Sequence, residues 1–245
     1  MNIIQAIVLS IVEGITEFLP VSSTGHLILT SSLLHISQTS FVKSFEIAIQ
    51  LGAILAVVGL YWQKLFKYWT KILSGFLPTA VIGFFAYPFI KSQLIGNIPV
   101  VLWSLFLGGL VLLVVDKITP RPGILNIQSA LVIGLFQSIS IVPGVSRAAA
   151  TIIGGLLVGL DRRSAVEFSF LLAVPTMFAA AGLDLIKSGW AFSSNEWLLL
   201  LVGFVGSLIT AWLTVKFFIA FVKSHNFFWF GIYRVGIAVI FFLTN

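Results

Sequence analysis

Long apolar runs make up most of this sequence and limit its possible folds more than any other feature. A helix of about 20 apolar residues spans the hydrocarbon of a bilayer. Of the 245 residues, 59% are hydrophobic and 9% are charged, against roughly 25% charged in a soluble domain. We therefore expect an integral membrane protein with spans at about Phe45–Trp62, Ile72–Ile90, Val100–Val115, Ala165–Ile186, Trp197–Val222 and Phe227–Leu243.

The pattern within the runs favours helices over strands. Transmembrane strands alternate apolar and polar residues over about ten positions, whereas these runs are continuous. We predict an all-α polytopic membrane protein with a single membrane domain over residues 1–245. Cysteine is absent, which excludes disulfides and thiolate chemistry. Residues 1–19 lack a basic start and contain two glutamates, so we expect them in the mature structure rather than in a signal peptide.

The net charge of +6 comes from basic residues scattered between the apolar runs. Such scattering is typical of loops that face anionic lipid, whereas a nucleic-acid surface gathers its charges on one patch. We expect membrane lipid as a partner and no nucleic acid.

Two further apolar regions, Ile3–Leu34 and Ile127–Leu160, are interrupted by Pro, Gly, Ser and charged residues. Non-helical backbone at membrane depth is tolerated only where protein or a water-filled cavity covers it. We predict that each region is a re-entrant helical hairpin whose break faces a polar interior.

Each broken region precedes three spans, which divides the chain into pseudo-repeat halves of about 1–118 and 119–245. The breaks share Pro-x-x-Ser, as Pro20-Val-Ser-Ser23 and Pro143-Gly-Val-Ser146. Three spans per half make the second half inverted relative to the first. An N-terminus outside leaves most basic loop residues in the cytoplasm, as the positive-inside rule requires, with only Lys43, Lys91 and Lys187 outside.

Glu13 and Glu17 are four residues apart and share one helix face just before the first break. Carboxylates in apolar surroundings need a partner, and a divalent cation such as Mg²⁺ or Ca²⁺ prefers oxygen ligands. The alternative is a structural pair that bonds backbone amides freed by the break.

The first break then supplies Ser22, Ser23, Thr24 and His26 at the start of a helix. Helix N-termini attract phosphate, hydroxyls can bind its oxygens or attack it, and imidazole moves protons near neutral pH. The same Ser-Ser-Thr-Gly is also an ordinary helix cap, and a lone histidine is more often structural. The neighbouring carboxylates favour a catalytic role for His26.

Arg147 and Thr151 follow the second break, one helical turn apart. A guanidinium matches phosphate oxygens and stabilises charge in phosphoryl transfer, so Arg147 is a candidate phosphate clamp. Alternatively, Arg147 neutralises a glutamate across the repeat interface. Glu46 and Gln50 could line the cavity or only pack between helices, and we expect Arg234 to pair with an acidic group or a lipid headgroup.

Taken together, these motifs resemble the signatures of the undecaprenyl-diphosphate phosphatase family, also called the bacitracin-resistance proteins. The resemblance is carried by Glu13-x3-Glu17 running into Phe-Leu-Pro-Val-Ser-Ser-Thr-Gly-His26, by Pro143-Gly-x-Ser-Arg147-x3-Thr151, by Phe45-Glu-x3-Gln-Leu-Gly52 and by Glu167-Phe-Ser-Phe-Leu-Leu-Ala-Val-Pro175. It implies a homodimeric enzyme of the bacterial plasma (inner) membrane that hydrolyses undecaprenyl diphosphate to the monophosphate carrier lipid of wall synthesis. It also implies six spans with two re-entrant hairpins, and a site opening to the periplasmic side.

The resemblance also assigns roles to residues. It gives Glu17, His26, Ser23 and Arg147 as catalytic, with Glu13, Thr24, Ser146 and Thr151 completing the cation and substrate sites. One position departs from the pattern, because Ala148 stands where the family commonly has Ser. Either Ser23 attacks phosphorus with His26 exchanging protons, or water attacks with His26 or Glu17 as base. The competing function is an undecaprenyl phosphate flippase, because inverted repeats with broken helices are a transporter architecture.

Overall fold

The computed structural model describes residues 1–94, 97–118, 122–188 and 192–244, and every regular element within them is a helix. Five helices are long and apolar enough to span a membrane, over Ser40–Lys67 (α3), Trp69–Ala86 within α4 (Trp69–Gln93), Ile98–Val115 (α5), Arg162–Gly182 within α8 (Arg162–Ser188) and Ser194–Phe221 (α9). The sixth predicted span corresponds to α10 (Phe228–Thr244), which has 17 residues. That length is at the short end of the range of about 17–25 residues that crosses a bilayer.

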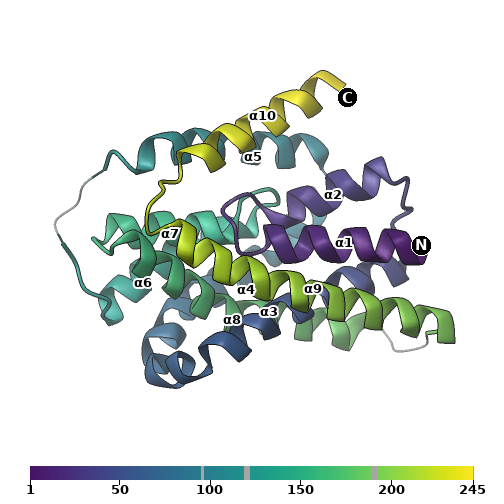
Figure 1. The fold of residues 1–245 in the computed structure, drawn as a ribbon, viewed down its shortest axis with the longest axis horizontal. Coiled ribbons are helices and arrows are strands. Elements are labelled where there is room, and N and C mark those ends of the chain that lie inside the picture. The colour runs from purple at the N-terminus through teal and green to yellow at the C-terminus, as the bar shows by residue number, and fades with distance from the viewer. Residues whose placement is uncertain (95–96, 119–121, 189–191, 245) are drawn as a thin grey trace.

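Each of the two interrupted regions forms a pair of short helices. The first contains α1 (Ile3–Thr16) and α2 (Ser23–Leu33), and the second contains α6 (Ile127–Ser138), the 3-10 turn η1 (Ile139–Ile141) and α7 (Arg147–Leu157). Because proline lacks an N–H, each break falls at its Pro-x-x-Ser sequence. Their two loops lie beside each other in the middle of Figure 1.

The caps of these short helices repeat between the two regions. Asn2 caps α1 and Asn126 caps α6, the first helix of each broken region. They form capping boxes with Gln5 and Ser129 respectively. The serine hydroxyls of Ser22 and Ser146 cap the returning helices α2 and α7, each 11 residues long. Side-chain oxygens thus satisfy N–H groups that a helix start leaves free.

Helix packing crosses between the halves 1–118 and 119–245. Helix α1 packs on α9 and α6 packs on α4, so the first helix of each broken region contacts a spanning helix of the other half. Helix α3 packs against both α8 and α9, and α10 lies along α5 at the top of Figure 1.

Small residues bring α1 and α9 into close contact. A Cβ on Gly14 would lie 1.9 Å from the Thr210 hydroxyl, and a Cβ on Gly206 would lie 2.4 Å from the Ser10 hydroxyl. The Thr210 hydroxyl lies 3.3 Å from the carbonyl oxygen of Ser10. Lipid gives no hydrophobic driving force between helices, so such close packing and hydrogen bonding hold them together.

The α6–α4 crossing uses the same arrangement. A Cβ on Gly134 would lie 2.0 Å from the Gly75 carbonyl oxygen, and the Thr79 hydroxyl donates to the Gly134 carbonyl at 3.0 Å. Both spanning helices therefore present Gly-x3-Thr, as Gly75-x3-Thr79 here and Gly206-x3-Thr210 in α9. This second internal correspondence was not predicted.

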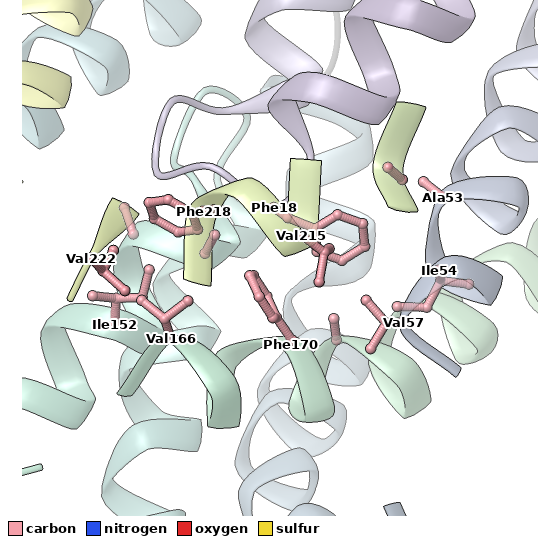
Figure 2. Close-up of a cluster of buried hydrophobic side chains, with 14 of the residues drawn as sticks. Phe18, Ala53, Ile54, Val57, Ile152, Val166, Phe170, Val215, Phe218 and Val222 are labelled. Atoms are coloured by element: carbon pink, nitrogen blue, oxygen red, sulfur yellow. The ribbon is translucent and has the colours of Figure 1, made fainter. Parts of the chain in front are cut away.

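A buried apolar cluster lies beneath the breaks, where α3, α7, α8 and α9 meet (Figure 2). The ring of Phe170 lies between Phe18 and Phe218, with centroids 5.4 Å and 6.2 Å away. Phe18 follows Glu17 directly, and Ile152 in the same cluster belongs to α7. The cluster thus fixes the backbone of both broken regions to the spanning helices.

The close α6–α4 contact predicts the effect of Gly134→Ala. The new methyl group would collide with the Gly75 carbonyl, and such overpacking costs about 1–3 kcal/mol. We expect a lower thermal unfolding midpoint in detergent. Gly236→Ala in α10 is the matched control, because a Cβ there meets no heavy atom within 4 Å; its midpoint should be unchanged or higher. Equal midpoints in the two variants would contradict the close contact.

Candidate functional site

A cavity of about 130 Å³ lies between the two breaks. A water molecule occupies about 30 Å³ in the liquid, so the cavity has room for an anion of phosphate size. Its walls come from both broken regions and from two spanning helices, and consist of Glu17, Ser22, Ser23, Thr24, Gln50, Ser140, Val145, Ser146, Arg147 and Met177. Most of these side chains are polar, as the predicted polar interior requires.

The first break contributes a carboxylate and three hydroxyls. The Ser23 hydroxyl donates a short hydrogen bond to Glu17 Oε2. Ser22 has a positive φ of 75°, and its hydroxyl accepts from the Gly25 N–H at 3.4 Å. This turn directs the N-terminus of α2 at the cavity, where its dipole favours an anion.

The second break contributes Arg147, which reaches across to the first. Its Nη2 forms an ion pair with Glu17 Oε1 at 3.2 Å, and its Nη1 donates to the Ser169 carbonyl at 2.9 Å. Its buried Nε has no hydrogen-bond partner among the described residues. The structure therefore contains the ion pair between Arg147 and a glutamate that the sequence left as an alternative. Arg147 also lines the cavity.

Glu13 lies behind this pair and is fully buried. Neither of its carboxylate oxygens has a hydrogen-bond partner in the part of the chain that the structure describes. It bonds no freed backbone amide, contrary to the structural alternative. The carboxyls of Glu17 and Glu46 repel a negative charge on Glu13, and the guanidinium of Arg147 attracts one. A buried carboxylate without a partner is costly, so this position suits a cation.

The protein supplies only part of a cation site. No cluster of three or more His, Cys, Asp or Glu with metal-binding geometry occurs among the described residues. Mg²⁺ commonly uses one or two carboxylates and takes its other ligands from water and substrate phosphates. Glu13 and Glu17 fit a cation of that kind. Both Glu17 oxygens already have partners, so Glu13 offers the free ones.

His26 is close to the cavity but is not among the described residues that line it. Its Nδ1 lies 2.8 Å from the Ser22 carbonyl and its Nε2 lies 2.8 Å from the Tyr233 hydroxyl. A carbonyl only accepts, so Nδ1 carries a proton, and in the neutral ring Nε2 accepts from Tyr233. In this conformation His26 forms no hydrogen bond with the side chain of Ser23 or Glu17.

The other predicted residues divide between the cavity wall and its support. Thr24 and Ser146 line the cavity, and the Ser146 hydroxyl also caps α7 by accepting from the Ala149 N–H at 3.1 Å. Thr151 is fully buried, with its hydroxyl 2.6 Å from the Ser169 hydroxyl. Thr151 therefore supports Arg147 from behind.

Sequence reasoning missed several residues of this region. Ser169 lies in the stretch Glu167–Pro175 that contributes to the resemblance but was given no role, and neither Ser140 nor Met177 was singled out. Tyr233 was not linked to His26. The expected acidic partner of Arg234 was wrong. Among the described residues its guanidinium donates to four backbone carbonyls, those of Pro20, Ser104, Leu105 and Gly144. No short-range signal reveals such a contact.

Most of the chain also matches known proteins. The sequence model of a family described as "Bacitracin resistance protein BacA" matches residues 6–240. The chain is 54% identical to an undecaprenyl-diphosphatase of Aquifex aeolicus, over 97% of this chain and 96% of that protein. It is 51% identical to one of Persephonella marina, over 99% of each. It is 48% identical to an undecaprenyl-diphosphatase of Thermus thermophilus, over 97% of this chain and 95% of that protein.

The unpartnered carboxylate predicts how Glu13→Gln responds to cations. The substitution replaces the buried carboxyl with a neutral amide of similar size and removes its electrostatic repulsion by Glu17 and Glu46, so without a cation the variant should unfold at a higher temperature than wild type. Mg²⁺ or Ca²⁺ should raise the midpoint of wild type and leave that of the variant unchanged. Thermal unfolding in EDTA and in each cation measures both effects.

Glu196→Gln is the matched control, since it removes an exposed charge and glutamine can keep the capping box with Ser193. Its response to cations should equal that of wild type. A cation shift that persists in Glu13→Gln would remove Glu13 from the cation site.

Proposed function

Because the chain belongs to the family of the bacitracin resistance protein BacA, we propose that it hydrolyses undecaprenyl diphosphate to undecaprenyl phosphate and inorganic phosphate. This reaction recycles the lipid carrier of wall synthesis and gives resistance to bacitracin. One observation carries the assignment to the cavity: hydroxyls of both breaks converge there with Arg147 and a carboxylate. These groups bind and transfer phosphoryl groups.

The membrane arrangement follows from the same assignment. Helices α3, α4, α5, α8, α9 and α10 cross the bacterial plasma membrane, and α1–α2 and α6–α7 enter and return as re-entrant hairpins of an inverted repeat. The cavity opens to the periplasmic side, where the prenyl chain can stay in the outer leaflet while the diphosphate enters. The chain works as a homodimer, as the family resemblance implies.

The geometry favours Ser23 as the nucleophile over direct attack by water. Its hydroxyl already donates to Glu17, which places a base on the attacking oxygen. Ser23 Oγ bonds to the terminal phosphorus as its proton passes to Glu17. The bridging P–O bond breaks, and undecaprenyl phosphate leaves with the electron pair and that proton. Water then attacks the phosphoserine, its proton reaches Ser23 Oγ through Glu17, and inorganic phosphate leaves.

Arg147 and the cation site neutralise the negative charge of the phosphates. The guanidinium of Arg147 exchanges part of its bond to Glu17 for the oxygens of the transferring group, which frees Glu17 to act as base. A divalent cation held by Glu13 and Glu17, Mg²⁺ or Ca²⁺, would supply charge neutralisation to the phosphate oxygens. With both carboxyls ionised, Arg147 alone leaves one negative charge uncompensated, which would otherwise repel the substrate.

His26 acts at a distance from the nucleophile in this scheme. Its bond to the Ser22 carbonyl orients the turn that carries Ser23, and proton exchange with substrate requires its Nε2 to leave Tyr233. The resemblance-based catalytic role of His26 therefore rests on movement of the ring during turnover.

The assay for this function is phosphate release from undecaprenyl diphosphate by purified protein. We expect one inorganic phosphate for each undecaprenyl phosphate formed, and loss of activity in excess EDTA. The alternative, a flippase for undecaprenyl phosphate, predicts movement of labelled monophosphate across reconstituted vesicles with no phosphate release from the diphosphate. That result would reject the phosphatase.

Attack by Ser23 makes a separate prediction about a covalent intermediate. After a short reaction with substrate labelled on the terminal phosphate, acid quenching should leave label on the wild-type protein. Ser23→Ala should show no label and lose at least about 10³-fold in kcat, because the nucleophile is gone. Ser146→Ala, which removes a cavity hydroxyl from the second break, should still form the labelled protein. Turnover by Ser23→Ala near the wild-type rate would assign the attack to water.

A further inference from the structure

Arg234 is a buried cation in the last helix, with a side chain that is 1% exposed. All the hydrogen bonds of its guanidinium go to backbone carbonyls. Within the described ranges, no carboxylate forms an ion pair with it. A charge in the membrane interior without a counter-charge is costly and commonly functional.

The four carbonyls belong to three segments that are far apart in the sequence. Nη1 donates to Pro20 in the first break at 3.3 Å, and Nη2 donates to Gly144 in the second break at 3.3 Å. Nη2 and Nε bond Ser104 and Leu105 of α5 at 2.9 and 3.2 Å. One guanidinium thus joins both breaks to a spanning helix.

The backbone around the guanidinium is shaped to receive it. A Cβ on Gly108 would lie 2.4 Å from Arg234 Nη2, so the guanidinium occupies space that only glycine leaves open. Gly144 adopts a φ of 87°, a backbone conformation that favours glycine. Both breaks interrupt the helical hydrogen bonding, so their free carbonyls need donors at membrane depth.

The bonded carbonyls are close in sequence to the reacting groups. Pro20 lies midway between Glu17 and Ser23, and Gly144 precedes Arg147 by three residues. The preceding residue of α10, Tyr233, bonds His26 of the first break. Helix α10 therefore bonds both walls of the cavity, through Arg234 at each break and through Tyr233 at the first.

We propose that Arg234 is a positioning residue, which sets the geometry of Glu17, Ser23 and Arg147 by clamping the two breaks together. The proposal rests on the proposed function for its kinetic consequences, but the clamp itself is a structural claim. Arg234 does not touch the substrate. Its planar fork, with donors on several sides, is what lets it reach four carbonyls at once, and lysine offers only a point charge.

The kinetic test compares Arg234→Lys, Arg234→Met and Gly108→Ala with wild type, each measured per folded protein. We expect all three to lose about 10²-fold in kcat, because displacement of about 1 Å at a reacting centre has that effect. The KM should change much less. Gly236→Ala is the matched control on α10, since its Cβ meets nothing within 4 Å, and it should keep the wild-type kcat.

The double variant Arg234→Met/Gly108→Ala separates a clamp from general damage. If Gly108→Ala acts by displacing the guanidinium, the double variant should lose no more kcat than Arg234→Met alone. Losses that multiply would overturn the proposal. So would an unchanged kcat in the folded fraction of Arg234→Met, or a wild-type kcat in Arg234→Lys.

A distance measurement tests the clamp without relying on catalysis. Spin labels can be attached to Cys at Ile15 and Ile139, which are exposed positions beside the two breaks in a chain without native cysteine. The label distance should be narrowly distributed in the wild-type background and in Gly236→Ala, and broader in Arg234→Met. Equal distributions in all three would overturn the clamp, whereas an inactive wild-type protein with this broadening would reject only the proposed phosphatase.

Discussion

The need to satisfy every backbone polar group inside a bilayer is the constraint on which this structure depends. The two breaks interrupt helical hydrogen bonding within a bundle that contains five helices apolar enough to span a membrane, so other groups must replace the missing partners. The hydroxyls of Ser22 and Ser146 accept hydrogen bonds from N–H groups in the first turns of α2 and α7. The guanidinium of Arg234 donates to the carbonyl oxygens of Pro20 and Gly144. The same irregular backbone leaves helix N-termini pointing into a cavity, so the structural solution also creates a site for anions.

Packing of small residues makes this arrangement rigid. Gly14 and Gly134 let the first helix of each broken region approach a spanning helix of the other half so closely that a methyl group would not fit. Each break is therefore attached to a helix that packs closely on the other half. The aromatic cluster around Phe170 adds contacts beneath both breaks (Figure 2). A site built from two loops can therefore hold the geometry that phosphoryl transfer requires.

The charges of the site are left unbalanced in a way that fits an anionic substrate and a cation. Glu17 is paired with Arg147 and Ser23, whereas Glu13 is buried with free oxygens. Free carboxylate oxygens repel a diphosphate, so Glu13 would suit an anionic substrate only through a cation that binds both. The cost of the buried groups is met by the close packing elsewhere, which is a common relation between stability and function.

The sequence by itself determined the class of the protein, the location of both breaks and most of the cavity wall. Apolar runs, proline and Pro-x-x-Ser act locally, so the long helices, both breaks and the serine cap of α2 could be predicted, as could the position of Glu17, Ser23 and Arg147 beside the breaks. Only the tertiary structure decided which groups meet. The Glu17–Arg147 pair, the contact of His26 with Tyr233 and the four carbonyls of Arg234 join residues about 90 to 214 positions apart. Backbone carbonyls carry no sequence signal, and local patterns hold no information on how helices cross.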